Sequence, residues 1–234
     1  MNIENATVLV TGANRGIGLA FCRALLARGA RKVYAGARDP SSVTLPGVQA
    51  LRLDVNQPAD VQAAARQAAD VTLLINNAGI AQPGGFMLAD SEDTTRRLFE
   101  TNFFAMLRVS QAFAPVLKAN GGGGLLNVLS IASWVNGGEL AAYSASKAAA
   151  WSLTNALRHE LAAQRTQVLG LHMAYVDTDL TRGLDAPKSS PDDIVSRALD
   201  GLEAGQHEVL ADALTQQIKQ GMTAPVPSYL PQSA

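Results

Sequence analysis

The sequence is short of cysteine, of net charge and of long apolar runs, and each shortage excludes a class of protein. Cys22 is the single cysteine among 234 residues, so no disulfide forms within the chain and a reducing compartment is expected. A formal net charge of −1 provides no basic surface for nucleic acid or an anionic membrane. No apolar run is long enough to span a bilayer, and residues 1–5 lack the basic and apolar regions of a signal peptide. We therefore expect a cytoplasmic protein with neither nucleic acid nor a membrane as partner.

Metal ligands at suitable spacing are also lacking. The three histidines, His159, His172 and His207, include no pair with metal-ligand spacing. We therefore predict no metal site and assign each histidine a packing or surface role. Cys22 follows Phe21 on an apolar, helix-like segment, so we expect it to be a buried packing residue and not a nucleophile.

What the sequence does contain is a regular alternation of strand-like and helix-like segments. Strands are expected at about 6–10, 32–37, 48–54, 71–76, 124–129, 167–173 and 207–210, and helices at about 16–28, 58–69, 92–118, 141–164, 191–204 and 211–220. Strands that alternate with helices pair in parallel through right-handed crossovers. The pattern predicts a single doubly wound α/β domain, with a mostly parallel seven-stranded sheet and helices on both faces. The proline-rich tail, residues 224–234, is expected to be extended or disordered unless something docks it.

A glycine-rich turn joins the first expected strand to the first expected helix. The turn, Thr11–Gly18 (TGANRGIG), follows a β-branched apolar run and precedes apolar residues at helical spacing. Gly12 permits a tight turn, Gly16 lets the backbone approach a pyrophosphate, and Gly18 permits close packing of helix on strand. Because a helix N-terminus attracts anions, this arrangement predicts a phosphate site. Its spacing, G-x-x-x-G-x-G, differs from the usual G-x-G-x-x-G fingerprint.

A tyrosine and a lysine stand four residues apart on one face of an expected helix, at Tyr143 and Lys147. An ordinary tyrosine titrates near pH 10 and is a poor acid at neutral pH. A lysine one turn away favours the phenolate, and lowering the pKa by ~3 units needs roughly 4 kcal/mol. Such a shift would allow Tyr143 to exchange a proton with a substrate oxygen at working pH.

These motifs, in this order, resemble those of the short-chain dehydrogenase/reductase family, and the resemblance covers nearly the whole chain. The turn at Thr11–Gly18 matches the family's T-G-x-x-x-G-x-G, and Asn76–Gly79 (NNAG) follows an apolar strand as in the family. Asp54–Val55 matches the family's D-V step, whose Asp meets the adenine ring. The resemblance implies a Rossmann-type domain in which residues 1–120 mainly bind the cofactor and residues 121–223 form the catalytic and substrate half.

The resemblance also implies a catalytic tetrad, which falls on Asn102, Ser130, Tyr143 and Lys147. Ser130 is placed to stabilise the developing charge on a carbonyl oxygen, and Tyr143 to donate the proton. Lys147 is expected to lower the pKa of Tyr143 and, as the resemblance implies, to bind the nicotinamide ribose. Asn102 would hold a water that links Lys147 to solvent. The predicted cofactor contacts are Gly12, Asn14, Arg15, Gly16, Ile17, Gly18, Arg38, Asp54, Val55, Asn77, Ala78, Gly79, Tyr143, Lys147, Val176 and Thr178.

The end of the second expected strand predicts the cofactor. A site that prefers NAD places a carboxylate there to bind the ribose 2′-hydroxyl, but the strand 33–37 is followed by Arg38, and Asp39 comes only after it. Arg38 can grip a 2′-phosphate with two hydrogen bonds, and Arg15 in the glycine turn supplies a second cation. Because NADP-preferring members of the family carry the same pair, we predict NADP(H).

The segment after the sixth expected strand departs from the family pattern. Val176 and Thr178 match the family's P-G-x-V-x-T, but Met173 and Ala174 replace the Pro-Gly. If that glycine needs a positive φ, Ala174 costs about 1 kcal/mol or the turn takes another form. The next segment, 179–190, is too short to build the lid that often covers the substrate in the family. An open site that tolerates bulky substrates is therefore expected, and the apolar residues Trp134, Val135 and Leu140 either form one wall of it or pack on the sheet.

The favoured function is an NADP(H)-dependent carbonyl reductase or alcohol dehydrogenase that acts on a small-molecule ketone, aldehyde or alcohol. One alternative is an enzyme similar to a ketoacyl-carrier-protein reductase, which would need a basic docking surface. Another is a non-catalytic dinucleotide sensor, which would be expected to lose Tyr143 or Lys147. The resemblance implies that the helices at about 92–118 and 141–164 form a subunit interface, and hence a homodimer or homotetramer.

Overall fold

The computed structural model describes residues 1–230, and a sheet of seven parallel strands lies at its centre. The strands are β1 (Thr7–Thr11), β2 (Lys32–Ala37), β3 (Gln49–Arg52), β4 (Leu73–Asn76), β5 (Gly123–Val128), β6 (Thr166–His172) and β7 (Glu208–Leu210). Their order is β3-β2-β1-β4-β5-β6-β7, and every neighbouring pair is parallel. The predicted doubly wound α/β fold is confirmed.

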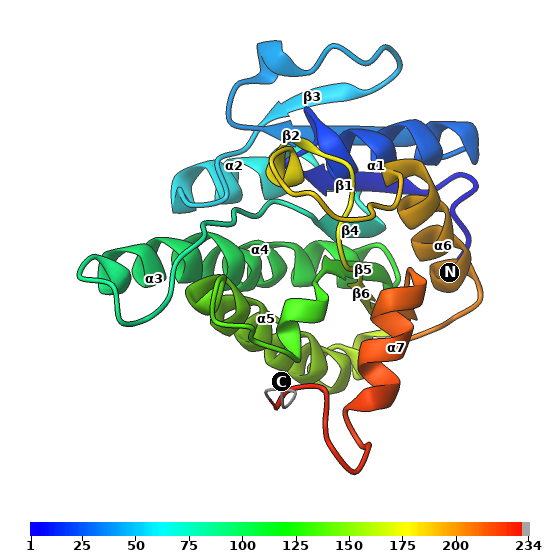
Figure 1. Cartoon of the computed structure of the whole chain (residues 1–234). Coiled ribbons are helices and arrows are strands. Elements are labelled where there is room, and N and C mark those ends of the chain that lie inside the picture. The colour runs from blue at the N-terminus through cyan, green and yellow to red at the C-terminus, as the bar shows by residue number, and fades with distance from the viewer. Residues whose placement is uncertain (231–234) are drawn as a thin grey trace.

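Helices cover both faces of the sheet (Figure 1). They are α1 (Gly16–Ala27), α2 (Pro58–Gln67), α3 (Ser91–Phe99), α4 (Ala105–Ala119), α5 (Ala141–Glu160), α6 (Pro191–Glu203) and α7 (Ala213–Gly221). Side chains of β1 alternate between the two sides: Val8 and Val10 pack with α1 and α6, and Leu9 packs with α2, α4 and α5. This alternation is the period of two that a strand imposes, and it builds one apolar core on each face.

The strand order reverses between β1 and β4, and this reversal positions the site. From β1 the chain crosses to β2 and β3 on one side, and from β4 it continues to β5, β6 and β7 on the other. Loops that leave such a switch point diverge, so a crevice opens beyond the carboxyl ends of the two strands. The turn after β1 and the loop after β4 both begin at this crevice.

The helix expected at about 92–118 is interrupted. The structure has α3, then a π-helical segment, Glu100–Phe104 (η2), and then α4. A π segment holds one extra residue per turn and is frequent at functional sites; here it carries Asn102. The helix expected at about 141–164 also ends early, at Glu160, and is followed by the 3₁₀ turn Ala162–Gln164.

The described part of the proline-rich tail folds back on α7. Ser228 N donates to Gly221 O at 3.0 Å, and Ser228 Oγ donates to Ile218 O at 3.1 Å. The remainder of the tail, 231–234, lies outside the described residues. Within residues 1–230, no helix combines the length and the apolar character needed to cross a membrane.

Candidate active site

The glycine turn has the geometry that its sequence predicts. Gly12 has a φ of 64° and Gly16 a φ of 52°, which are left-handed conformations that glycine adopts at little cost. A Cβ on Gly18 would lie 2.2 Å from the carbonyl oxygen of Gly12 and 2.6 Å from Asn77 Nδ2, so a side chain there is excluded. Within residues 1–230, no side chain caps the first turn of α1. Its N–H groups therefore face the crevice as an anion site.

Hydrogen bonds join the loops after β1 and β4. Thr11 Oγ1 accepts from the N–H groups of Asn77 and Ala78, each at 3.0 Å. In return, Asn77 Nδ2 donates to Thr11 O at 2.9 Å and to Gly12 O at 3.1 Å. These four bonds fix the two predicted cofactor loops relative to each other. The NNAG motif thus brings its second Asn and its Ala onto the glycine turn.

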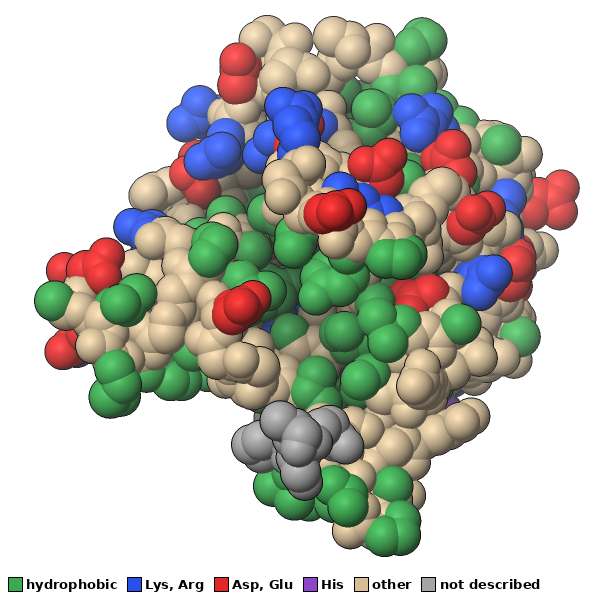
Figure 2. Space-filling view, viewed as in Figure 1, with side chains coloured by type: hydrophobic (Ala, Val, Ile, Leu, Met, Phe, Trp, Pro, Cys, Tyr) green, Lys and Arg blue, Asp and Glu red, His purple; other side chains and the backbone are tan. Residues whose placement is uncertain are grey.

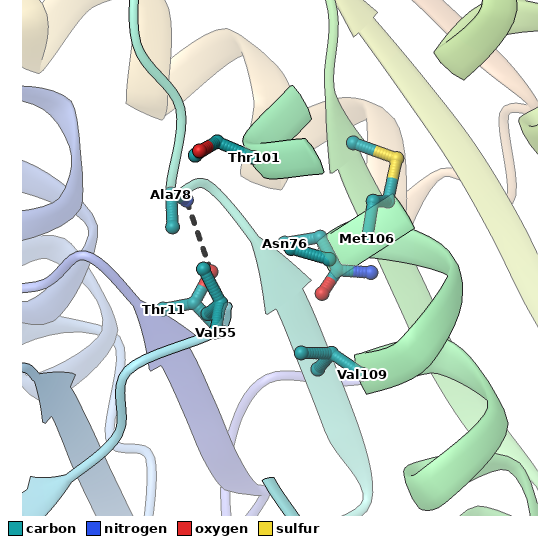
Figure 3. A pocket seen from close by; sticks show the side chains of 8 residues that line it. Thr11, Val55, Asn76, Ala78, Thr101, Met106 and Val109 are labelled. Atoms are coloured by element: carbon teal, nitrogen blue, oxygen red, sulfur yellow. Dashed lines mark hydrogen bonds between the residues drawn. The ribbon is translucent and has the colours of Figure 1, made fainter. Parts of the chain in front are cut away.

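A small cavity lies beside this junction, between the ends of β1 and β4 and the helix α4 (Figure 3). Val55 and Ala78, both predicted to contact the cofactor, point toward it. Asp54, the other half of the D-V step, accepts from Asn56 N at 3.0 Å, which holds the loop after β3 in a turn. The residues that line the cavity are Thr11, Val55, Asn76, Ala78, Thr101, Ala105, Met106 and Val109.

Three of the four predicted catalytic residues meet where β5 ends against α5. Ser130 follows β5, and its side chain lies near enough to the hydroxyl of Tyr143 on α5 to favour the phenolate. Lys147, one turn later, donates from Nζ to Val128 O at 2.9 Å. Ser130 and Lys147 are buried, whereas Tyr143 is partly exposed. The phenol is therefore the member of this group that solvent or a substrate can reach.

The electrostatics of this group differ from the sequence-based expectation. Burial raises the pKa of Tyr143, and the neighbouring Ser130 side chain acts in the opposite direction. Burial also lowers the pKa of Lys147 from its ordinary value of 10.5 to about 8. Lys147 was expected to lower the pKa of Tyr143, but its Nζ lies 5.9 Å from the centre of the tyrosine ring and binds Val128 O. In this structure the group that favours the phenolate is Ser130.

Asn102 occupies the π-helical segment and is almost fully buried. Its Oδ1 accepts from Ile80 N at 2.9 Å, and its Nδ2 donates to Ile80 O and to Ser146 Oγ, each at 2.9 Å. The side chain thus connects the loop after β4 with α5. A Cβ on Gly79 would lie 3.2 Å from Asn102 Oδ1 and 3.8 Å from Lys147 Nζ, so the glycine keeps this space open. The implied water between Asn102 and Lys147 stays a prediction.

The two arginines predicted to bind a 2′-phosphate are both exposed, and Arg15 forms an ion pair with Asp179 at 3.1 Å. Asp39, the carboxylate nearest the end of β2, accepts from Ser41 N at 3.0 Å and from Ser41 Oγ at 2.8 Å. These bonds lower the pKa of Asp39 and turn it into a cap for the 3₁₀ turn Pro40–Ser42. The carboxylate of Asp39 is therefore engaged by Ser41, and Arg38 is the cation at this strand end. Figure 2 shows basic side chains gathered near the ends of β1 and β2, above a hollow with hydrophobic walls.

The loop after β6 does not use the backbone conformation that a glycine at position 174 would allow. Ala174 has no positive φ, and its N–H donates to Asp212 Oδ2 at 2.8 Å. Thr178 reaches the glycine turn, since a Cβ on Gly16 would lie 3.4 Å from Thr178 Cγ2. Val176 is buried and forms an isolated bridge with Ser189. Thr178 therefore lies beside the crevice despite the altered turn, whereas Val176 packs into the core.

The segment 179–190 builds little over the site. Its regular structure is one 3₁₀ turn, Asp179–Thr181. Leu180 and Leu184 are 56% and 43% exposed, so their apolar surface is available to a substrate. Trp134 is instead buried and stacks on His172, whereas Val135 and Leu140 stay partly exposed.

The structure places the remaining predicted residues as follows. Asn14 and Ile17 are partly exposed within the glycine turn. Cys22 is fully buried in the α1 core, and burial raises the pKa of its thiol to about 12, which makes it a packing residue. His172, to which sequence reasoning assigned an ordinary role, lies behind Ser130: its Nδ1 is 3.1 Å from Ser130 O. The sequence offered one indication of this contact: His172 ends β6, the neighbour of β5, and Ser130 follows β5.

Comparisons with known proteins agree with this geometry. A family model described as short chain dehydrogenase matches residues 6–189. A solved short chain dehydrogenase from Burkholderia cenocepacia, in complex with NADP, is 40% identical with a TM-score of 0.92, and the match covers 96% of this chain and 95% of that one. The 1-deoxy-11-beta-hydroxypentalenate dehydrogenase of Streptomyces avermitilis is 34% identical over 204 residues, which are 81% of this chain and 76% of the relative. The 3-oxoacyl-acyl-carrier-protein reductase of Escherichia coli is 30% identical over 193 residues, 79% of each protein.

Proposed function

Because this chain belongs to the short-chain dehydrogenase family, it is an oxidoreductase that acts on small-molecule carbonyls or alcohols, and we propose that it is an NADP(H)-dependent carbonyl reductase with Tyr143 as the general acid. The observation that carries the proposal is the contact of the Ser130 side chain with the Tyr143 hydroxyl. Tyr143 is the partly exposed member of the group, so a substrate oxygen can approach both hydroxyls.

The residues around the crevice fit a dinucleotide. The backbone at Gly12 and Gly18 leaves no room for side chains, and the first turn of α1 presents N–H groups to a pyrophosphate. Asn77 and Ala78 are held against this turn by Thr11, next to the cavity that Val55 lines. We assign the adenine side to Val55 and Ala78 and the nicotinamide side to Lys147 and Thr178.

When bound, NADPH supplies the hydride that adds to the carbonyl carbon. Ser130 donates a hydrogen bond to the carbonyl oxygen and stabilises the negative charge that develops there. Tyr143 then transfers its proton to that oxygen, and Ser130 favours the phenolate that remains. The raised pKa of Tyr143 keeps it protonated at neutral pH, as an acid in the reductive direction must be.

The acid is tested by Tyr143→Phe, which removes only the hydroxyl. The expected result is a fall in kcat of roughly 10²–10⁴-fold, with NADPH affinity preserved, because a positioned proton donor contributes about this much. The matched control is Tyr229→Phe, which changes an exposed tyrosine in the tail and should leave kcat unchanged. A Tyr143→Phe variant that kept more than about a tenth of the wild-type rate would contradict the role.

We further propose that the enzyme prefers NADP(H) over NAD(H). The support is that Arg38 directly follows β2 and is exposed, while Asp39 is bound to Ser41. Arg38→Ala should lower kcat/KM with NADPH by roughly 10–100-fold, the worth of a charge-assisted bidentate contact, and change the value with NADH little. Arg52→Ala is the control, since Arg52 is an exposed arginine on β3 whose ion-pair partner is Asp60. Wild-type kcat/KM with NADH at or above that with NADPH would reject the proposal.

A second candidate, a 3-oxoacyl-acyl-carrier-protein reductase, is favoured by the 30% identity to the Escherichia coli enzyme of that name. The two candidates differ in what the substrate is attached to. A carrier-linked ketoester should be reduced no faster than a free ketoester of the same chain length if the carbonyl reductase proposal is right. A large preference for the carrier-linked form would favour the second candidate.

We propose an open substrate site with a broad range. The support is the short segment 179–190, which forms one 3₁₀ turn and leaves the side chains of Leu180 and Leu184 exposed. Each missing apolar contact is worth only about 1–3 kcal/mol between substrates, so bulky and aryl ketones and aldehydes should be accepted and acetone should bind weakly. The measurement is kcat/KM over a panel of carbonyls, and one small carbonyl that outperformed every bulky one by about a hundredfold would contradict the proposal. A cytoplasmic location is proposed with it, on the support of a single, buried thiol.

A further inference from the structure

His172 ends β6 directly behind the catalytic serine. Its ring is fully buried, and Nδ1 lies 3.1 Å from the backbone carbonyl oxygen of Ser130. A carbonyl oxygen can only accept a hydrogen bond, so a bond at this distance requires the proton of the ring on Nδ1. The strand ends around it are already paired, since Leu129 N donates to Leu171 O at 2.8 Å and Ile131 N donates to Met173 O at 3.0 Å. His172 thus adds a side-chain bond at the one residue between these two backbone bonds.

The other nitrogen of the ring faces an acidic residue. Nε2 of His172 lies 3.4 Å from Glu208 Oε1, which is long for a hydrogen bond, while Glu208 Oε2 pairs with Lys219 Nζ at 3.0 Å. The ion pair with Lys219 favours the charged form of Glu208, whose pKa is lowered to about 2, so it is a carboxylate at every working pH. Burial lowers the pKa of His172, so the ring is neutral at neutral pH and holds one proton. The shorter contact assigns that proton to Nδ1.

The plane of the ring is fixed by aromatic side chains. Trp134 stacks on His172 with the ring centres 4.0 Å apart and the planes at 21°. Trp151 meets Trp134 edge-on at 6.3 Å, and Lys219 Nζ lies 4.4 Å from the centre of the Trp134 ring. A ring that is stacked on its face and bonded at Nδ1 has little freedom to turn. The direction of the bond to Ser130 is therefore set by packing that lies entirely outside the catalytic group.

We propose that His172 is a positioning residue: its Nδ1–H holds the backbone of Ser130 so that the serine hydroxyl meets Tyr143 and the substrate oxygen. The proposal rests on the function proposed above. Ser130 sits at a corner, where the extended backbone after β5 turns into the 3₁₀ segment Ile131–Ser133. Its hydroxyl already accepts from Ala132 N at 3.1 Å and contacts Tyr143, so a small rotation of this corner would misdirect the hydroxyl.

Substitutions of His172 can separate the two nitrogens. The amide nitrogen of Asn lies near the position of Nδ1, that of Gln lies near Nε2, and Phe keeps the stacked ring without a donor. His172→Asn should keep kcat within about threefold of wild type, whereas His172→Gln and His172→Phe should lose roughly 10–100-fold, since misplacement by about 1 Å costs up to 10²-fold. NADPH affinity should stay unchanged in all three. His159→Asn, on the exposed end of α5, is the control and should have no effect.

The pH profile distinguishes positioning from a role in folding. In alcohol oxidation Tyr143 is the base, so kcat/KM rises with pH through the pKa of Tyr143. Because Ser130 lowers that pKa, His172→Phe should shift the inflection to higher pH, and His172→Asn should restore it. A residue needed only for folding would lower Tm and leave the inflection in place. An unshifted inflection together with unchanged kcat in folded His172→Phe and His172→Gln would overturn the proposal.

A measurement without turnover keeps the two proposals apart. In long-range ¹H–¹⁵N spectra of the wild-type chain at neutral pH, the His172 ring, identified by its loss in His172→Asn, should show the proton on Nδ1. A proton on Nε2 alone would overturn the positioning role, whatever the activity. If wild type reduces no carbonyl with NADPH, the proposed function fails, but the spectrum still shows whether His172 Nδ1 carries the proton that the bond to Ser130 O requires. If wild type is active and the substitutions behave as the control does, only the positioning role fails.

Discussion

Burial of Lys147 lowers the free energy of unfolding of the protein, and replacing this residue should therefore stabilise the fold. The side chain is 5% exposed, and burial lowers its pKa from 10.5 to about 8. This difference corresponds to roughly 3 kcal/mol by which the folded state disfavours the protonated amine. Lys147→Met removes the amine and keeps the bulk of the side chain, but it also removes the hydrogen bond to Val128 O, worth about 1 kcal/mol. The variant should be about 2 kcal/mol more stable than wild type at neutral pH.

The sign of the effect changes with pH. Below about pH 8 the lysine is protonated in both states, and wild type carries the full cost. Between about pH 8 and 10.5 the folded state releases its proton before the unfolded state does, so wild type gains stability while the variant does not. The advantage of Lys147→Met in urea unfolding should therefore shrink as pH rises and disappear near pH 10.

Lys118→Met, at an exposed lysine near the end of α4, is the matched control and should show no such trend. Turnover of Lys147→Met should be lost at every pH, because stability and activity make opposite demands on this position. A variant less stable than wild type at neutral pH, or a difference that does not change with pH, would refute the burial cost assigned to Lys147.

Three further expectations concern the cofactor turn, the π segment and assembly. Gly18→Ala places a Cβ 2.2 Å from Gly12 O, so NADPH affinity should fall about tenfold or more. The control is Gly137→Ala, where a Cβ meets nothing within 4 Å, and it should leave NADPH affinity unchanged. Equal affinities in the two variants would contradict the packing argument. Asn102→Leu leaves the N–H and C=O of Ile80 without their partner and should lower the free energy of unfolding by about 2 kcal/mol or more. A loss below about 0.5 kcal/mol in urea titration would contradict this role of Asn102. Light scattering at micromolar concentration should show a dimer or tetramer, built on α4 and α5 with the 46%-exposed Phe104 in the contact; a monomer would remove this proposal.

Much of this fold follows from patterns that are local in the sequence. Alternating strands and helices predict the parallel pairing, and the predicted motif residues follow the ends of strands, because parallel strands share one carboxyl edge. The π segment was not predictable in this way. The apolar spacing on both sides of Asn102 is that of an ordinary helix, and one extra residue in a turn does not change this hydrophobic pattern enough to be recognised.

The features that sequence reasoning missed depend on partners far along the chain. His172 acts on Ser130 across 42 positions, and Ala174 finds Asp212 across 38. Neither His172 nor Asp212 belongs to a motif, so periodicity and spacing carry no sign of the contacts. The pKa of Tyr143 was misjudged for a related reason: the sequence shows that Lys147 is near, but not how strongly the surroundings desolvate the two groups.

The bond from Ala174 N to Asp212 Oδ2 bears on how this enzyme could be engineered. Asp212 also accepts from Thr215 N and caps α7, so one carboxylate joins the loop after β6 to the last helix. Consensus design would replace Ala174 by the glycine common in relatives, on the assumption that frequent residues stabilise. Here the backbone does not use the conformation that glycine offers, and the change would add freedom to the unfolded chain at a cost of about 0.4–1 kcal/mol. The residue at position 174 should therefore be chosen together with its partner Asp212 and not by its frequency among relatives.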